Sequence, residues 1–279
     1  MNRTRPRISI ITSVLNAAST IRRELGSIEQ QSYEDLELVI MDGGSADGTV
    51  EILREFDHLI SYWESKPDRG IYHAWNKALE HITGDWICFL GADDYLWSSE
   101  ALSQMVPHLE KALGKVRIVY GNLNIVDSNE SVALTLGEPW YVAGPRFRHN
   151  LSIPHPGMFH HRSLFEQLGR FDESFKIAGD YEFLLRELLS NDARFVEGIV
   201  VVGMQERGES DLPENAVATL KEVLRAQHIH GITKVPNWLS LRLLKERIRW
   251  WLTILMNYRA ALSVVNTYRR LMGRPKLPR

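Results

Sequence analysis

Three short segments of the 279-residue chain combine carboxylates with glycines directly after apolar stretches. They are Asp42-Gly43-Gly44-Ser45, Asp68-Arg69-Gly70 and Gly91-Ala92-Asp93-Asp94. Adjacent carboxylates such as Asp93 and Asp94 repel each other unless positive charge lies close by. A divalent cation that also binds phosphate oxygens meets this need, because such cations prefer hard oxygen ligands and take few of them from the protein. A turn that caps a helix near Ser98 is the alternative explanation.

The elements that must position these segments form a regular alternation. We predict strands at 8–14, 36–41, 58–63 and 86–90, and helices at 18–31, 47–56 and 71–82. This pattern indicates an α/β protein with a mainly parallel central sheet and helices on both faces. Ligands of such sheets bind beyond the carboxyl ends of the strands, so we expect the three segments to converge there with Thr12. Each segment alone is also explained as a turn, because Asp and Gly favour turns and caps.

The rest of the chain is less regular. Here we predict helices at 98–113 and 181–190, strands at 117–120, 132–136, 159–162 and 195–202, a helical turn at 164–168 and a loop over 137–156. Ser45 is a candidate N-cap for the helix at 47–56. The single cysteine, Cys88, lies in an apolar run and is expected to be a buried, inert thiol. We predict one domain over residues 1–231, followed by a tail over 232–279.

The net charge of −2 hides a division along the chain. The 33 Lys and Arg residues nearly balance 35 Asp and Glu residues, but residues 232–279 hold 11 of the basic residues and one acid, Glu246. This tail therefore carries +10 and the preceding residues −12. Its apolar residues recur at helical spacing between 238 and 258, which predicts a basic amphipathic helix. Such a helix can pack on its own domain, form a homo-oligomer interface or lie on an anionic membrane surface. With an acidic body, we expect no nucleic-acid partner.

The carboxylate segments also resemble the motifs of family-2 glycosyltransferases with the GT-A fold. Residues 42–49 resemble the family's D-G/D-G-S-x-D-G-T, residues 68–78 its D-x-G-I-Y-D-A-M-N-K-G, and residues 84–94 its T-G-(D/E)-x-I-x-F-L-N-A-D-D. The resemblance extends over about residues 6–205 and is to a bacterial branch that builds colanic acid, capsule and lipopolysaccharide sugars. It implies the GT-A fold, a Rossmann-like, mainly parallel sheet flanked by helices, here with the C-terminal amphipathic helical tail.

The resemblance implies a role for each residue of the site. The residues that would bind the nucleotide-sugar are Thr12, Asp42, Asp68, Arg69 and Asp93. Asp42 would accept the imide N–H of a pyrimidine base, and Asp93 would hold the ribose hydroxyls. Asp94 would bind Mn²⁺ or Mg²⁺ that bridges the diphosphate and stabilises the leaving group. Gly43 and Gly91 depart from the family, where acidic or amide residues are common.

A general base and an acceptor contact complete the implied site. Residues 178–186 resemble the family's A-x-D-Y-x-L-x-L-R, whose Asp removes the proton of the acceptor hydroxyl in an inverting transfer; this is Asp180. Taken alone, Asp180 is an ordinary acid in the first turn of a helix, and Asp172 and Glu182 are rival carboxylates. His155 lies in a stretch that resembles one placed on the acceptor side.

These observations predict a metal-dependent, inverting glycosyltransferase. It would move one sugar from a nucleotide-diphospho-sugar, with UDP favoured over GDP, to a hydroxyl of a surface polysaccharide or lipid-linked acceptor. A sugar-1-phosphate nucleotidyltransferase is one alternative, although residues 12–19 lack its Gly-rich basic loop. A non-catalytic, membrane-recruited subunit that binds sugar nucleotides is another. We expect no signal peptide and no spanning helix, and a cytoplasmic location, peripheral on the inner face of the cytoplasmic membrane.

Overall fold

The computed structural model describes residues 5–127, 130–205, 213–233, 241 and 245. The chain divides into two compact units, residues 1–206 and 207–279. The first unit holds the sheet, and the second holds helix α8 (Pro213–Ile229), which the sequence analysis did not predict. The amphipathic helix predicted between 238 and 258 lies outside the described residues, except for positions 241 and 245. No helix in the described ranges is long and apolar enough to cross a membrane.

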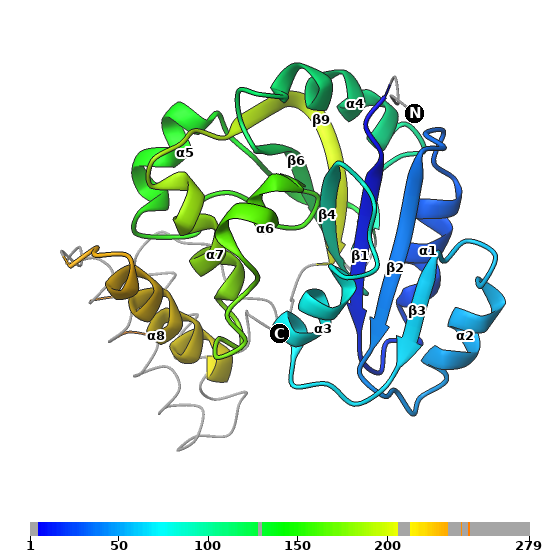
Figure 1. The fold of residues 1–279 in the computed structure, drawn as a ribbon. Coiled ribbons are helices and arrows are strands. Elements are labelled where there is room, and N and C mark those ends of the chain that lie inside the picture. The colour runs from blue at the N-terminus through cyan, green and yellow to red at the C-terminus, as the bar shows by residue number, and fades with distance from the viewer. Residues whose placement is uncertain (1–4, 128–129, 206–212, 234–240, 242–244, 246–279) are drawn as a thin grey trace. The chain divides into compact units, whose positions relative to one another are not determined.

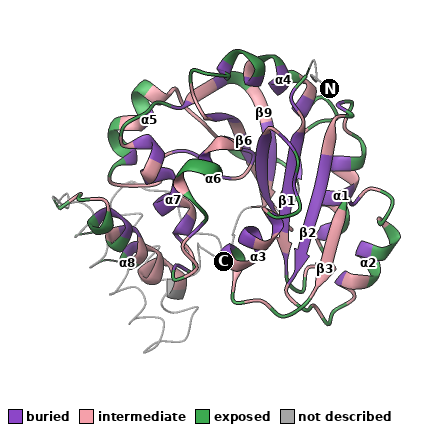
Figure 2. Cartoon of the chain, viewed as in Figure 1, coloured by how far each residue is buried: buried purple, intermediate pink, exposed green. Residues whose placement is uncertain are grey.

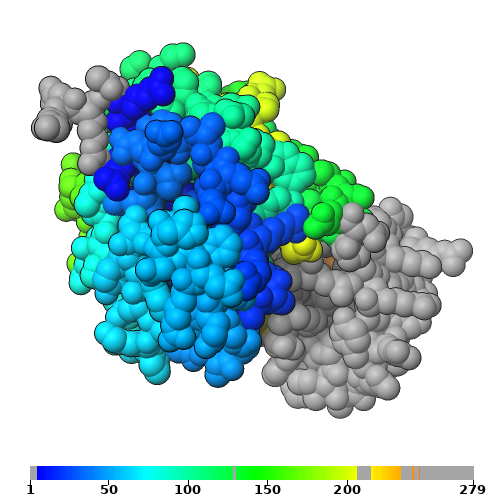
Figure 3. All heavy atoms as spheres, turned by 90° about the vertical axis from the view of Figure 1, so that its right-hand side faces the viewer, coloured from blue at the N-terminus to red at the C-terminus, as the bar shows by residue number. Residues whose placement is uncertain are grey.

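The first half of the sheet unit is the predicted alternation of strands and helices (Figure 1). Its elements are β1 (Ile8–Val14), α1 (Ile21–Glu29), β2 (Leu36–Asp42), α2 (Thr49–Glu55), β3 (Tyr62–Ser65), α3 (Ile71–Ala78) and β4 (Trp86–Gly91). The strands lie in the order β3-β2-β1-β4, and every neighbouring pair is parallel. Seen from the side of α2 and β3, the face of this unit consists largely of atoms from these elements (blue to cyan in Figure 3).

The second half extends the sheet with mixed pairing. Its elements are β5 (Tyr95–Leu96), α4 (Ala101–Ala112), β6 (Ile118–Val126), β7 (Val132–Leu136), α5 (Trp140–Phe147), β8 (Phe159–His161), α6 (Ser163–Leu168), α7 (Gly179–Leu188) and β9 (Arg194–Gln205). The full order is β3-β2-β1-β4-β8-β6-β9-β5, with β7 on β6. Strand β8 is antiparallel to both β4 and β6, whereas β6 and β9 are parallel. The all-parallel part of the sheet is thus the part that ends in the carboxylate segments.

Successive residues of a strand point to opposite faces of the sheet. Both faces of the parallel strands carry apolar side chains, and helices cover both. Ile10 of β1 belongs to one apolar cluster with Leu25 of α1. On the opposite face, the rings of Trp75 in α3 and Phe89 in β4 lie 4.6 Å apart. The central strands are accordingly buried along their length (Figure 2). Cys88 is buried among them as predicted, and burial raises its pKa to about 12.

Three local predictions were wrong. The third strand was predicted at 58–63, but β3 covers Tyr62–Ser65, because residues 56–59 form a turn after α2. The stretch predicted as a loop contains α5, which starts directly after Pro139, where the fixed φ of proline suits a helix start. Ser45 does not cap α2. The residue before that helix is Gly48, with a φ of +101° that favours glycine, and the Ser45 hydroxyl instead bonds to Asp42.

Candidate active site

The candidate site lies at the carboxyl edge of the parallel strands β2, β1 and β4. Asp42 ends β2 and pairs in register with Val14, which ends β1. Gly91 ends β4 and pairs with Ser13. Because neighbouring strands are about 4.8 Å apart, the ends of β2 and β4 lie about 10 Å from each other. The Asp42 segment and the Asp93-Asp94 segment therefore flank the end of β1, as predicted.

Asp42 is buried, and the loop that follows it fixes its carboxylate. The backbone N–H groups of Gly44 and Ser45 donate to Oδ2 over 3.2 and 3.0 Å. The Ser65 hydroxyl, from the end of β3, donates to the same oxygen over 2.5 Å, and the Ser45 hydroxyl donates to Oδ1. Hydrogen bonds to a charged acceptor are the strong ones, so this carboxylate has a single well-defined orientation.

Asp68 lies beside this loop, as predicted. A methyl group added to Gly43 would lie 3.0 Å from Oδ2 of Asp68, so the glycine at this position permits the close approach of the two segments. Oδ1 of Asp68 accepts the backbone N–H of Gly70 over 2.8 Å. The neighbouring Arg69 pairs with Glu173 at 2.6 Å, so a bound nucleotide would compete with Glu173 for its guanidinium.

Asp94 is a buried carboxyl with one oxygen that lacks a partner. The backbone N–H of Gly91 donates to Oδ2 over 2.9 Å, whereas Oδ1 bonds to no described residue. Burial, and secondly the charge of Asp93, raise the pKa of Asp94 to about 7. A methyl group on Gly91 would lie 2.9 Å from Oδ1 of Asp93 and 3.0 Å from Oδ2 of Asp94, so both carboxylates gather over this glycine. Neither residue caps α4, whose N-cap is Glu100.

The chemistry of this turn fits a divalent cation that takes most of its oxygen ligands from phosphate and water and few from the protein. Among the residues that the structure describes, no three His, Cys, Asp or Glu side chains are grouped to hold a metal ion. Asp94 would therefore share the cation with phosphate and water oxygens, which is how Mg²⁺ is usually bound. The unpartnered Oδ1 of Asp94 is available for such a contact.

A buried glutamate, Glu24 on α1, lies behind this turn and was missed by the sequence analysis. Its side chain is fully buried and accepts the Thr12 hydroxyl, while Oε2 has no partner among the described residues. Burial raises the pKa of Glu24 well above its usual value, and the charges of Asp94 and Asp93 act in the same direction. Thr12, predicted to bind the nucleotide-sugar, is itself fully buried, and its hydroxyl is already bonded to Glu24. The available signal was an acid on the same helical face as Leu25.

Asp180 lies partly buried in the first turn of α7, next to the start of α3. The Tyr72 hydroxyl lies 2.7 Å from the Ile177 carbonyl and 3.2 Å from Oδ1 of Asp180, so its one proton is shared between them. A methyl group on Gly179 would lie 2.7 Å from the Tyr72 ring, so the glycine at this position permits the close approach of α7 and α3. Asp68 and Asp180 therefore adjoin the same end of α3.

The rival carboxylates are already used in local structure. Glu182 is buried and pairs with Arg186 one helical turn away, at 2.5 Å. Asp172 accepts the backbone N–H of Ser174 over 2.8 Å. Asp180 also accepts a hydrogen bond, from Tyr72, so these contacts do not separate the three carboxylates, and Asp180 stays the predicted base.

His155 lies in an aromatic cluster rather than on an open surface. It is 6 % exposed, and its ring centroid lies 5.4 Å from that of Trp75 and 5.8 Å from that of Phe89. Burial lowers its pKa to about 4, so the ring is neutral at physiological pH. Its Nε2 has no partner among the described residues. An acceptor contact through His155 stays a prediction and requires a group that reaches into this cluster.

Comparison with known proteins assigns this arrangement to a family. The sequence profile described as Glycosyl transferase family 2 matches residues 9–167, more than half of the chain. The chain therefore belongs to glycosyl transferase family 2. A Mycobacterium tuberculosis protein named PGL/p-HBAD biosynthesis glycosyltransferase is 29 % identical over 273 residues, which cover 95 % of this chain and 98 % of the relative.

Solved structures show the same fold at lower sequence identity. A 1–349 fragment of S. aureus TarS, in complex with UDP-GlcNAc, has a TM-score of 0.63 at 17 % identity, covering 86 % of this chain and 71 % of that one. The mannosyltransferase PcManGT from Pyrobaculum calidifontis, in complex with GDP-Man and Mn²⁺, has a TM-score of 0.61 at 20 % identity, covering 96 % and 80 %. The predicted GT-A fold and the predicted enzyme class, a glycosyltransferase, are both confirmed.

Proposed function

We propose that this glycosyltransferase is inverting and metal-dependent, and that it moves one sugar from a nucleotide-diphospho-sugar to a hydroxyl of a surface-polysaccharide or lipid-linked acceptor. The observation that carries the proposal is the placement of the buried Asp42 and the Asp93-Asp94 turn on either side of the end of β1. This spacing suits a ligand with a base at one end and a diphosphate at the other.

The donor would lie along this edge of the sheet. Asp42 would accept the imide N–H of the base, beside Asp68, and Asp93 would hold the ribose hydroxyls. A cation on Asp94, Mn²⁺ or Mg²⁺, would supply positive charge that stabilises the departing diphosphate. Structural neighbours bind UDP-GlcNAc and GDP-Man, so both nucleotide classes occur on this fold. We favour UDP, because the resemblance of residues 42–49 to the family motif implies that Asp42 accepts the imide N–H of a pyrimidine base.

Asp180 would act as the general base. Its carboxylate takes the proton of the acceptor hydroxyl while that oxygen attacks the anomeric carbon from the face opposite the diphosphate. The bond between the anomeric carbon and the diphosphate oxygen breaks, and the nucleoside diphosphate leaves with the electron pair. The Tyr72 hydroxyl, within hydrogen-bond distance of Asp180, holds the carboxylate in position.

The acceptor would be presented at the inner face of the cytoplasmic membrane. The mycobacterial relative is named for PGL/p-HBAD biosynthesis, and the +10 charge of residues 232–279 suits an anionic lipid surface. Replacing Arg242, Arg249 and Arg259 by Gln in the full chain should reduce co-sedimentation with vesicles that contain phosphatidylglycerol. Equal sedimentation of both forms would reject the membrane role.

A donor-hydrolysis screen tests the proposed function. UDP-, GDP- and dTDP-sugars are incubated with the protein and Mn²⁺, and release of the nucleotide is measured for the wild type, Asp94→Asn and the exposed control Glu51→Gln. We expect one nucleotide class to be cleaved, with a loss of at least about a hundredfold in Asp94→Asn, because a catalytic metal stabilises the transition state by several kcal/mol. Full activity of Asp94→Asn would refute the metal assignment.

A further inference from the structure

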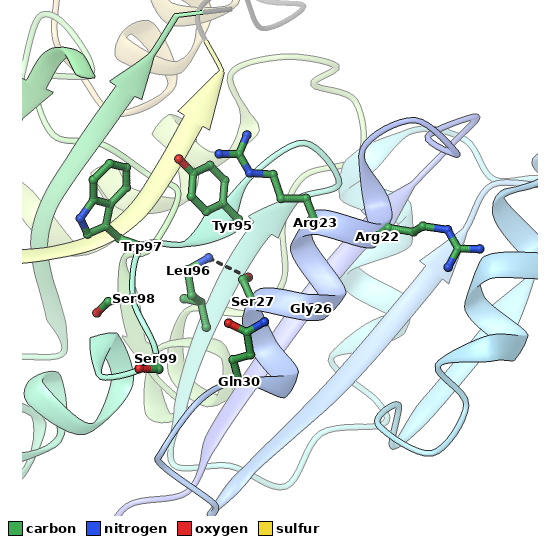
Figure 4. Close-up of a pocket in the computed structure, with 10 residues that line it drawn as sticks. All are labelled: Arg22, Arg23, Gly26, Ser27, Gln30, Tyr95, Leu96, Trp97, Ser98 and Ser99. Carbon is green, nitrogen blue, oxygen red and sulfur yellow. Dashed lines mark hydrogen bonds between the residues drawn. The ribbon is translucent and has the colours of Figure 1, made fainter. Parts of the chain in front are cut away.

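An open hollow lies between α1 and the chain that follows the Asp93-Asp94 turn. This α1–β5 pocket has a volume of about 390 Å³, within the range of about 300–1,000 Å³ that is usual for small-molecule sites. Figure 4 shows its walls: α1 contributes one side, and residues 95–99 contribute the other. The residues used below are Arg23, Gly26, Gln30, Trp97, Ser98 and Ser99.

The charges around the α1–β5 pocket are balanced. Arg22 points away from it (Figure 4) and pairs with Glu55 at 2.7 Å. Arg23 lies 3.6 Å from Glu130 and covers the Tyr95 ring, with its guanidinium carbon 3.6 Å from the ring centroid. Because each arginine already faces an acid, the pocket suits an uncharged ligand better than an anion.

The apolar and hydrogen-bonding side chains of the pocket are complementary to the surface of a sugar. Trp97 is half-buried, its backbone N–H donates to the Val201 carbonyl over 2.9 Å, and its ring centroid lies 6.1 Å from that of Tyr95, so the indole forms an apolar part of the wall made by residues 95–99. Gln30 lies opposite Trp97, at the end of α1, whereas Ser98 and Ser99 follow Trp97 on the same wall; the side chains of all three bond to none of the residues that the structure describes. Amides and hydroxyls both donate and accept hydrogen bonds. A pyranose has the complementary surface, with hydroxyls around its rim and an apolar face.

Gly26 gives an independent reason to treat the pocket as a binding site. It lies inside α1, where glycine is the least favourable residue after proline. Nothing lies within 4 Å of a methyl group built on it, so packing among the described residues does not require a glycine here. What the missing side chain does is leave the α1 side of the pocket open.

We propose that the α1–β5 pocket binds one sugar unit of a neutral oligosaccharide, at a site separate from the donor site. This inference goes beyond the proposed function and does not depend on the metal or the base. The pocket adjoins the donor site through the chain, because Tyr95 follows Asp94 directly and the Leu96 N–H donates to the Ser27 hydroxyl of α1 over 3.0 Å.

Ligand-observed saturation-transfer NMR on the full chain tests the proposal. The probes are maltose, cellobiose, chitobiose and mannobiose at about 10 mM, since a single sugar unit should bind with about millimolar affinity. Gly26→Leu fills the pocket, Trp97→Ala removes its wall, and Lys111→Leu on the exposed face of α4 is the matched control. Donor hydrolysis is measured in parallel for each variant, which separates this site from the proposed function.

We expect at least one disaccharide to bind the wild type and Lys111→Leu, with a loss of at least about tenfold in affinity in Gly26→Leu and Trp97→Ala and unchanged donor hydrolysis. Absence of binding to the wild type, or undiminished binding to Gly26→Leu, would overturn the proposal. Displacement of the disaccharide by UDP or GDP would show that it occupies the donor site, and displacement by inorganic phosphate would show that the pocket selects anions; either result refutes the assignment.

Discussion

Replacing Tyr72 with phenylalanine removes the hydroxyl that contacts Asp180 and leaves the ring in place. The hydroxyl proton is shared between the Ile177 carbonyl at 2.7 Å and Oδ1 of Asp180 at 3.2 Å. Its loss removes a donor that favours the ionised carboxylate. If Asp180 is the base, the variant should therefore need a higher pH to reach half of its maximal transfer rate.

The distances set the size of this effect. A hydrogen bond contributes about 0.5–1.5 kcal/mol net, and one pH unit corresponds to about 1.4 kcal/mol, so a full bond would shift the acid limb by up to about one pH unit. The shorter contact to Ile177 takes the larger share of the single proton. We therefore expect a shift of about half a pH unit.

The assay is the rate of sugar transfer from pH 5 to 9 at saturating donor. Tyr181→Phe is the matched control, because it likewise removes a buried tyrosine hydroxyl, one that donates to the Phe147 carbonyl over 3.0 Å. Both variants should lose similar stability, but only Tyr72→Phe should shift the acid limb. An unshifted profile in Tyr72→Phe, or the same shift in Tyr181→Phe, would refute the reasoning.

Three further predictions concern stability, measured by urea unfolding. Gly203→Ala should lose about 1–3 kcal/mol of stability, because its methyl group would overlap a buried tyrosine ring. Gly26→Ala should gain about 1 kcal/mol of stability, because its methyl group would lie in open space and alanine favours the helix. The reverse order of the two stabilities would contradict these packing assignments. His160 is fully buried, and its pKa is lowered to about 3, so below pH 6.5 the unfolded chain binds more protons than the folded one. The free energy of unfolding should therefore fall by about 1.4 kcal/mol per pH unit through this residue as the pH falls. An unchanged dependence of stability on pH in His160→Phe would disprove this. Arg117→Ala should cost about 3 kcal/mol or more of stability, because it leaves the buried Glu187 carboxylate without its ion-pair partner. Arg22→Ala, at an exposed ion pair, should change stability little. Equal losses in the two variants would refute the burial argument.

Local patterns were sufficient to predict the parallel half of the sheet. Strand β1 is a short β-branched run bounded by polar residues, and β4 is a continuous apolar run, which is typical of strands buried on both faces. Because parallel strands end at one edge, the meeting of Asp42 with the Asp93-Asp94 turn followed from the order of elements alone. Helix α5 escaped prediction because Pro139 before it and its own Gly144 and Pro145 are typical of loops, and β5 because two residues show no period.

Contacts between distant residues were beyond the reach of these patterns. Tyr72 and Asp180 are 108 positions apart, and only the packing of α3 against α7 brings them together. The contact of His155 with Trp75 arises from tertiary packing between residues 80 positions apart, which the sequence pattern does not show. Glu24 lay on a predicted apolar face, yet the sequence could not show that Thr12 would be its partner.

Transfer by Asp180→Asn tests the central claim most directly. The variant keeps the shape and one hydrogen-bond acceptor of the side chain but cannot take a proton, so donor binding should be unchanged while the transfer rate falls by a factor of about 10²–10⁴. Asp172→Asn, at the nearby rival carboxylate, should transfer at close to the wild-type rate. A wild-type rate in Asp180→Asn, or a loss confined to Asp172→Asn, would contradict the assignment of Asp180 as the base of this glycosyltransferase.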